Sequence, residues 1–316
     1  MPTTANAAKR VRRSLTGVLL LDKPVGLSSN AALTHAKILY NADKAGHTGT
    51  LDPFASGLLP VCFGEATKFA GYLLAADKAY EATVRLGKTT TTGDREGAVL
   101  TESPVETSRA AVIRVLDQFK GPTSQYPPMF SALKFQGRPL YELARQGVEI
   151  PRQARKITIH RLDLVEFQPP LLKLLVVCSK GTYVRVLAED IGKALGCGGM
   201  LEELRRTRTG GFDIADSLTL ERLGELAPES RDAHLAGPDR LVGDLPEITL
   251  DELAGRALMQ GRASPVATEL AMGTYRAYGP AREFFGLVEA AAGCLKAKRM
   301  MSAPWPAPQT ESDDIA

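Results

Sequence analysis

The sequence predicts an α+β fold with a mixed, mostly antiparallel central sheet flanked by helices and loops, followed by a small β-rich module. The 316 residues are 44% hydrophobic, enough for one large domain and a smaller one. Stretches with strand periodicity outnumber helical stretches and do not alternate with them regularly, which disfavours a doubly wound sheet. Residues 236–246 are rich in glycine, proline and aspartate, which indicates a linker before the smaller module.

The first part of the chain contains two predicted strands with a helix between them. The apolar run at residues 17–21 predicts a buried strand, and residues 80–86 alternate apolar and polar side chains. Ser28 can cap a helix in which apolar residues at positions 32–39 share one face. Residues 41–64 contain six glycines and prolines, so we expect a long shaped loop with short regular pieces there.

The second part shows the same mixture of elements. Helices are expected after Ser108 and between Pro139 and Gly147, where the apolar spacing and the start and stop residues are typical of helices. Strands are expected at residues 156–167 and 171–178. We expect a flexible basic arm, a large domain, a small domain and a disordered tail, in that order at residues 1–13, 14–245, 246–301 and 302–316.

The overall charge does not identify a partner. Lys and Arg total 39 and Asp and Glu total 36, so the formal net charge is only +3. The cations gather in three short blocks, which either bind phosphate groups or form solvated surface. These blocks lie at residues 9–13, 205–208 and 296–299.

Cysteine and histidine usage argues against metal chemistry. The four cysteines show no paired spacing, and there are only four histidines, so the sequence predicts no metal and a reducing cytoplasm. No cofactor-binding motif is present. The longest early apolar run, at residues 17–21, is too short to cross a membrane.

The most unusual segment is the loop at residues 46–53, which mixes glycines, hydroxyl groups, His47 and Asp52 without helical or strand periodicity. It lacks the Gly-Lys-Ser/Thr ending of a phosphate-binding P-loop, so that function is rejected. Pro53 disfavours a helical conformation at the preceding residue. From the residues alone, Asp52 either starts a turn or carries chemistry, and His47 is either an ordinary loop histidine or a functional one.

Arg185 is predicted to lie in the first turn of a helix, behind a possible cap at Thr182. A cation there opposes the helix dipole at a cost of about 0.5 kcal/mol. A buried carboxylate partner would offset this cost, and the alternative is an arginine that points into solvent. Tyr80, which begins an apolar strand face, and Tyr183, beside Arg185, are by default core residues.

Six runs of residues resemble the bacterial TruB family in order and spacing. One motif alone would be weak, but six in the same order are specific. The resemblance is close over about residues 15–215 and looser over the C-terminal module, which is similar to a PUA-type RNA-binding domain. The matching runs lie at residues 17–24, 46–53 with 57–60, 64–68, 128–134, 141–147 and 178–185.

The resemblance implies a pseudouridine synthase fold and an enzyme that isomerises uridine-55 in the T loop of tRNA. The base would be flipped out of its stack, and no cofactor would be needed. Asp52 corresponds to the family's nucleophile, Arg185 to its ion-pair partner and Tyr80 to the residue that packs on the target base. Further site residues implied in this way are His47 at the T loop, Tyr183 and Leu204 in the uracil pocket, and Lys23 and Pro24 in a supporting loop.

The same resemblance implies a cytoplasmic monomer that binds the T stem-loop of tRNA, with no membrane and no obligatory protein partner. Phe130 stands where the family often has tyrosine, and Thr91 where it often has aspartate in the run that ends at Asp94. We expect an ion pair with Arg185 to lower the pKa of Asp52 against the upward effect of burial. Two alternatives stay open: a guide-RNA-dependent, dyskerin-like synthase, and a tRNA-binding or tRNA-folding module without catalysis.

Overall fold

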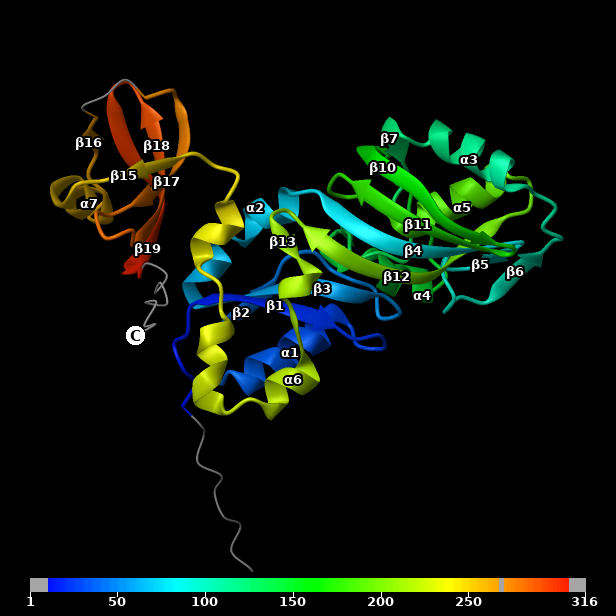
Figure 1. The fold of residues 1–316 in the computed structure, drawn as a ribbon, viewed down its shortest axis with the longest axis horizontal. Coiled ribbons are helices and arrows are strands. Elements are labelled where there is room, and N and C mark those ends of the chain that lie inside the picture. The colour runs from blue at the N-terminus through cyan, green and yellow to red at the C-terminus, as the bar shows by residue number, and fades with distance from the viewer. Residues whose placement is uncertain (1–10, 267–269, 307–316) are drawn as a thin grey trace, which may run out of the picture.

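The computed structural model describes residues 11–266 and 270–306, and its main feature is a ten-stranded sheet (Figure 1). The spatial order of eight strands is β14 (Leu218–Thr219), β1 (Gly17–Lys23), β3 (Ser56–Phe63), β12 (Gly199–Thr209), β4 (Lys78–Leu86), β11 (Leu171–Cys178), β10 (Arg155–Gln168) and β7 (Gly121–Gln125). The remaining two, β2 (Ala45–His47) and β13 (Phe212–Asp213), pair with β3 and β12. The β1–β14 and β3–β12 pairs are parallel and the other pairs of this sheet antiparallel, so the predicted mixed, mostly antiparallel sheet is confirmed.

Helices and short hairpins surround this sheet (Figure 1). The helices are α1 (Ser29–Leu39), α2 (Ala70–Ala75), α3 (Arg109–Gln118), α4 (Leu140–Arg145), α5 (Val184–Ala194) and α6 (Leu220–Glu225). The hairpins are β5 (Lys88–Thr90) with β6 (Val99–Glu102), and β8 (Lys134–Phe135) with β9 (Arg138–Pro139). The 3-10 helices are η1 (Gly64–Lys68), η2 (Ile214–Asp216), η3 (Pro228–His234) and η4 (Pro238–Val242). None of the helices in the described ranges is long and apolar enough to cross a membrane.

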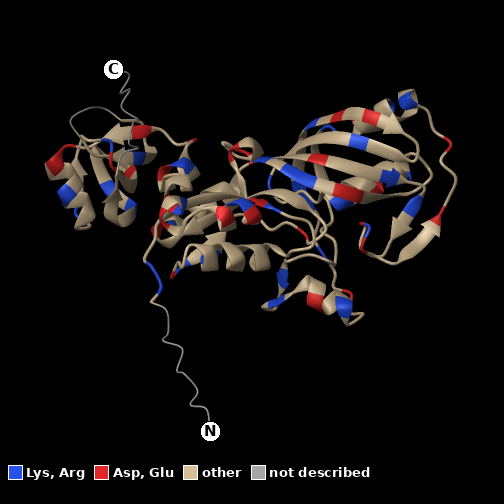
Figure 2. Ribbon diagram, turned by 60° about the horizontal axis from the view of Figure 1, so that its bottom comes forward, with Lys and Arg blue, Asp and Glu red and all other residues tan. Residues whose placement is uncertain are grey.

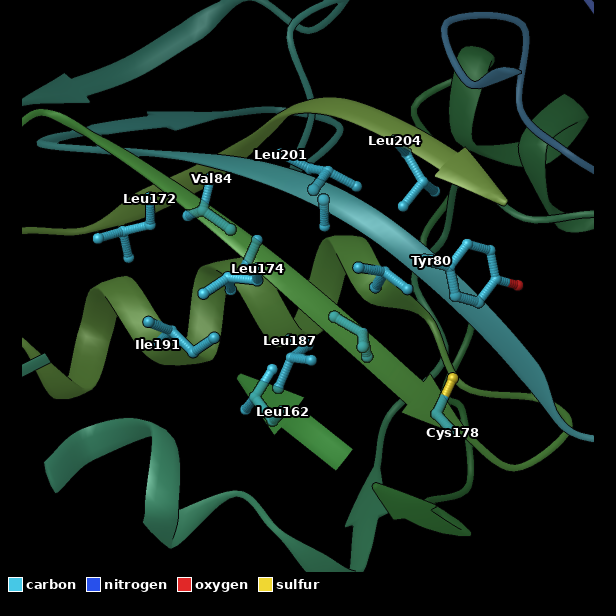
Figure 3. Close-up of a cluster of buried hydrophobic side chains, with 14 of the residues drawn as sticks. Tyr80, Val84, Leu162, Leu172, Leu174, Cys178, Leu187, Ile191, Leu201 and Leu204 are labelled. Carbon is cyan, nitrogen blue, oxygen red and sulfur yellow. The ribbon is translucent and has the colours of Figure 1, made fainter. Parts of the chain in front are cut away.

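The largest apolar cluster lies between α5 and the strands β4, β11 and β12 (Figure 3). Leu187 and Ile191 of α5 face Val84 and Leu174 from the sheet. Burying a side chain of this kind stabilises the fold by about 1.5–3 kcal/mol. Tyr80 lies at one end of the same cluster, so the apolar face predicted for residues 80–86 is confirmed.

The region predicted as a loop at residues 41–64 contains an eight-residue buried strand, β3, so that prediction is wrong over residues 56–63. Pro60 is accommodated opposite Leu20 in the antiparallel pair with β1. Gly57 has φ +103°, and a Cβ there would lie 2.3 Å from the backbone carbonyl oxygen of Arg206. Glycine is therefore needed at this position for β12 to approach β3. This explains why the sequence of a strand contains a residue that is typical of turns.

Helix caps agree with the sequence in two places and differ in one. Ser28 and Ser108 accept the backbone N–H groups of Ala31 and Ala111, as predicted for the caps of α1 and α3. The predicted cap at Thr182 is wrong. Tyr183 occupies the N-cap position of α5, and the Thr182 hydroxyl donates to the carbonyl oxygen of Ser179 instead.

The smaller domain is a five-stranded sheet with one helix. Its elements, in spatial order of strands, are β15 (Glu247–Thr249), β17 (Gly273–Tyr278), β18 (Phe284–Ala291), β19 (Cys294–Trp305) and β16 (Ser264–Pro265), with α7 (Glu252–Met259). This small β-rich domain confirms the predicted fold class. The predicted tail is wrong at its start, because β19 continues through residues 302–305. Residues 307–316 lie outside the described residues.

The two domains share an apolar cluster. Phe69, which precedes α2, packs on Phe284 of β18 with ring centroids 5.4 Å apart. Leu241 and Val242 of the predicted linker are buried in the same cluster, so this segment is packed and helical. At the other end, residues 1–10 of the predicted basic arm lie outside the described residues, and Arg13 forms an ion pair with Asp232.

Candidate active site

Leu204 lines a separate cavity, whereas three of the predicted site residues, His47, Asp52 and Arg185, line one of about 540 Å³ in the large domain. It lies between the loop after β2, the turn after β5 and the segment that leads into α4. Its lining side chains include Ser29, His47, Asp52, Thr92, Asp94, Phe130, Tyr141 and Arg185.

The loop that carries Asp52 is held at two points before the aspartate. The Ser29 hydroxyl, in the first turn of α1, donates to the carbonyl oxygen of Leu51 at 2.9 Å and accepts its N–H at 2.8 Å. Arg206 of β12 donates to the carbonyl oxygens of Leu58 (2.7 Å) and Gly49 (3.0 Å). These contacts fix the loop while 38% of the Asp52 side chain stays exposed.

Arg206 belongs to the cationic block at residues 205–208, for which the sequence allowed two interpretations, phosphate binding or solvated surface. Arg206 agrees with neither interpretation. Its side chain is only 1% exposed and reaches under the loop. Arg205 forms an ion pair with Asp22 at 2.7 Å, and Arg208 is exposed. The three cations therefore do not form a common phosphate-binding surface. Strand alternation places Arg206 inward, on the same side of β12 as Leu204.

Arg185 lies in the first turn of α5, as predicted, and is 4% exposed. Its Nε is 3.0 Å from Oδ2 of Asp52, which confirms the predicted contact. The same guanidinium donates to the backbone carbonyl oxygens of Thr92 (2.8 Å) and Phe130 (2.6 Å). Carboxylate and carbonyl partners offset the unfavourable position at the helix start, so Arg185 does not point into solvent.

A second carboxylate, Asp94, shares this arginine and was given no role from the sequence. Its Oδ2 is 3.4 Å from Nη1 of Arg185, and the residue is 4% exposed. Oδ1 of Asp94 accepts the Thr92 hydroxyl (2.6 Å) and the Glu96 N–H (3.0 Å). Thr91 is one of the two positions at which the sequence differs from the pattern that it resembles. Its hydroxyl accepts the N–H of Ala98 at 3.1 Å and so closes this turn.

The pKa of Asp52 is raised, which corrects the expectation that the ion pair lowers it. Burial is the main cause and the charge of Asp94 adds to it, whereas the Arg185 charge and hydrogen bond act in the opposite direction. Because 38% of the side chain is exposed, water moderates the shift in the open cavity.

His47 and Lys23 lie near this carboxylate. His47, at the end of β2, lines the cavity, and burial together with the Arg206 charge lowers its pKa, which favours the neutral imidazole. Lys23 is fully buried, and its ammonium donates to the carbonyl oxygens of Pro24 (2.8 Å) and Leu27 (2.7 Å). Burial lowers the pKa of Lys23 to about 8, although the charge of Asp52 acts against this.

The two aromatic candidates, Tyr80 and Tyr183, are not among the residues that line the cavity. Tyr80 is 8% exposed and belongs to the main apolar cluster, in which Leu204 lies near it (Figure 3). Tyr183 exchanges two hydrogen bonds with the Gln125 side chain: its N–H donates at 2.8 Å and its carbonyl accepts at 3.1 Å. Burial raises the pKa of both phenols, so both stay protonated at neutral pH.

A larger cavity, of about 780 Å³, lies between β7, the start of β10 and the turn that precedes α5. Three cations line it together with several hydroxyl side chains, a composition suited to phosphate groups. The cations are Arg155, Lys156 and Lys180. Residues 11–266 and 270–306 contain no cluster of His, Cys, Asp and Glu side chains that could hold a metal ion.

Comparison with solved structures and family models defines the class. The crystal structure of a Cbf5-Nop10-Gar1 complex matches with TM-score 0.69 and 26% identity, covering 90% of this chain and 84% of that one. A Nop10-Cbf5 complex of the archaeal box H/ACA sRNP matches with TM-score 0.67 and 24% identity, over 90% of this chain and 85% of that one. Residues 37–184 match the model for the N-terminal domain of TruB family pseudouridylate synthases. The fold and these matches define a pseudouridine synthase.

Two further models match segments that follow in the chain. Residues 185–242 match the tRNA pseudouridylate synthase B C-terminal domain, and residues 246–301 match the pseudouridine synthase II TruB C-terminal model. The tRNA pseudouridine synthase B of Aromatoleum aromaticum is 54% identical, with 92% of this chain and 94% of that protein aligned. That of Thiobacillus denitrificans is 53% identical over 93% and 98%, and that of Burkholderia mallei 50% over 95% and 99%. The chain belongs to the TruB family.

Proposed function

We propose that the protein converts uridine-55 in the T loop of tRNA into pseudouridine, with Asp52 as the catalytic carboxylate. One observation carries this proposal: a partly exposed aspartate in a cavity, 3.0 Å from a buried guanidinium. The relatives named tRNA pseudouridine synthase B support the choice of tRNA as the substrate. The position within the T loop rests on the motif resemblance.

The chemistry requires no electron donor or acceptor. The N1–C1′ bond breaks, the detached uracil turns, C5 bonds to C1′, and a proton leaves C5 while N1 gains one. Asp52 can attack C1′, attack C6 of the base, or remove the C2′ proton. Each route needs an ionised carboxylate, which Arg185 at 3.0 Å favours, and each benefits from the raised basicity that burial confers.

The target base must leave its stack to reach this carboxylate. We assign Tyr80 to stacking on the flipped uracil, with Leu204 and Tyr183 forming the pocket around it. Because Tyr80 is 8% exposed, a base that stacks on it must enter the apolar cluster beside Leu51. His47 would contact the T loop from the cavity wall, and Lys23 and Pro24 would support the loop from below.

Phosphate binding is assigned to the cavity lined by Arg155, Lys156 and Lys180 and to the exposed cations of β19. In this proposal the enzyme acts as a cytoplasmic monomer on tRNA, without a guide RNA or an obligatory protein partner. A guide-dependent synthase remains an outcome to test, since solved Cbf5 structures share the fold.

The test is to incubate the purified chain with unmodified tRNA and with a bare T-arm hairpin, and to map pseudouridine chemically. We expect modification at uridine-55 of both RNAs. Inactivity on the hairpin that a guide RNA restores would favour the guided class, and binding without modification would favour the non-catalytic module. Asp52→Asn should bind tRNA normally and show no turnover; near-normal pseudouridine formation by this variant would overturn the assignment.

A further inference from the structure

The smaller domain is attached to the large domain through polar contacts at η1 as well as through the apolar cluster. Oε2 of Glu65 accepts hydrogen bonds from the N–H (2.7 Å) and the hydroxyl (2.9 Å) of Ser302 on β19. Lys68 forms an ion pair with the same carboxylate at 2.5 Å and donates to the carbonyl oxygen of Met300 at 3.1 Å. We call Glu65, Lys68, Met300 and Ser302 the η1 clamp.

These contacts restrain more than an ordinary surface ion pair does. The side chains of Glu65 and Lys68 are each 27% exposed, and two of their partners are backbone groups of β19. Burial pushes the pKa of Glu65 upward, but the hydrogen bonds from Lys68 and Ser302 outweigh it and leave the pKa below its ordinary value. The carboxylate therefore stays ionised at neutral pH, and its hydrogen bonds are of the stronger, charge-assisted kind.

The same 3-10 helix is connected to the loop that carries Asp52. The strand β3 begins at Ser56, just after that loop, and ends immediately before η1. At Gly64 the backbone has φ +51°, and a Cβ would lie 2.3 Å from the carbonyl oxygen of Leu15, so this junction is tightly packed. The catalytic loop and the clamp thus lie at the two ends of one buried strand.

On the other side, the clamp fixes a cationic strand. The residues that precede Met300 on β19 include Lys296, Lys298 and Arg299, which are all exposed. Lys and Arg segments are visible on the strands of the smaller domain in Figure 2. The position of these cations relative to β3 and the Asp52 loop therefore depends on how β19 is held at residues 300–302, as well as on the apolar cluster.

We propose that the η1 clamp is a positioning device, which holds β19 so that an RNA bound along its cations presents the target uridine to Asp52. This inference rests on the proposed function. Glu65 and Lys68 touch neither substrate nor catalytic groups and act only through the orientation of the smaller domain. The clamp therefore contributes to the recognition of RNAs long enough to contact both domains, and not to the chemistry on a short hairpin.

The test compares Glu65→Ala with the unaltered protein on two substrates, full-length tRNA and the bare T-arm hairpin. The variant loses the charged acceptor for Ser302 and Lys68, so we expect KM for tRNA to rise on the order of tenfold with kcat unchanged. Kinetics on the hairpin should stay within about twofold. Glu65→Gln keeps an acceptor for Ser302 and should recover part of the loss.

Asp117→Ala is the matched control, because Asp117 in the last turn of α3 and Lys120 just after that helix form an ion pair of the same spacing at 2.8 Å without contacting the smaller domain. It should leave both substrates unaffected. Equal losses on tRNA and hairpin for Glu65→Ala, or no loss on either, would overturn the proposal. A failure of the unaltered protein to modify tRNA would instead overturn the proposed function, so the two failures are distinguishable.

Discussion

Replacing Arg206 tests how the catalytic loop is held in place. Arg206→Met keeps the length and much of the apolar volume but removes the hydrogen bonds to the carbonyl oxygens of Leu58 and Gly49. Each buried carbonyl left unpaired costs about 1–3 kcal/mol. The cost of burying the guanidinium, which lowers the pKa of Arg206, is relieved at the same time. We expect a net loss of about 2–4 kcal/mol and a fall in Tm of about 5–10 °C.

The effect on turnover should be larger than the effect on stability suggests. Gly49 lies just before Asp52 in the loop, and its carbonyl is the point at which Arg206 ties the loop to the sheet, since the other acceptor, Leu58, belongs to β3. A misplacement of a reacting group by about 1 Å can reduce the rate by about 100-fold. We therefore expect kcat to fall by about this factor, measured as initial pseudouridine formation well below the midpoint of thermal unfolding.

Arg205→Met is the control, since it makes the same change one residue away. Arg205 contacts Asp22 at 2.7 Å with a side chain that is 40% exposed, so its loss should cost less than about 1 kcal/mol and leave kcat within about twofold. If Arg206→Met retained normal kcat while folded, or if both variants lost activity equally, the role assigned to Arg206 would be refuted.

Three further predictions concern the carboxylate pair, the β3–β12 contact and phosphate binding. Asp94→Asn removes a charge that raises the pKa of Asp52, so the acid limb of the kcat/KM profile should move to lower pH; an unmoved limb would contradict this coupling. Gly57→Ala should lower the free energy of unfolding, measured by urea denaturation, by more than about 2 kcal/mol. Gly211→Ala, with nothing within 4 Å of the added Cβ, should change this free energy little. Lys180→Ala should weaken tRNA binding and reduce the slope of log K against log salt by about one, and an unchanged slope would remove Lys180 from the phosphate site.

Much of the fold could be predicted because its signals are local. The strand predicted at residues 171–178 is β11 with the same bounds, since all its residues except Lys173 are apolar and a turn follows it. The strand β3 could not be predicted, because Gly57 and Pro60 are typical of turns when read alone. Gly57 is required by the backbone of β12, a neighbour that is distant in sequence, and no local pattern reports such a neighbour.

Some residues of the candidate site could also be predicted from local signals, and others could not. Arg185 could be selected because it breaks a local rule at a helix start, and the structure supplies the partners that the rule requires. Arg206 could not, since no strand is predicted from the sequence over residues 199–209, and it is the alternation along that strand that places Arg206 inward. Asp94 was visible only as the end of a threonine-rich turn. Its importance depends on the contact with Arg185, which only the folded chain provides.

The unfavourable burial of the carboxylates at this site is already present in the folded protein. Two carboxylates, Asp52 and Asp94, lie within 3.4 Å of one guanidinium, and burial disfavours ionisation of the reactive one. Such an arrangement persists only if the surrounding contacts hold it, and Ser29 and Arg206 do so from two directions. In the proposed function, Asp52 would therefore need little reorganisation when a flipped base arrives. A carboxyl group with a raised pKa leaves the protein less stable above that pKa than below it, which opposes the stabilisation that Asp52 provides by pairing with the buried Arg185.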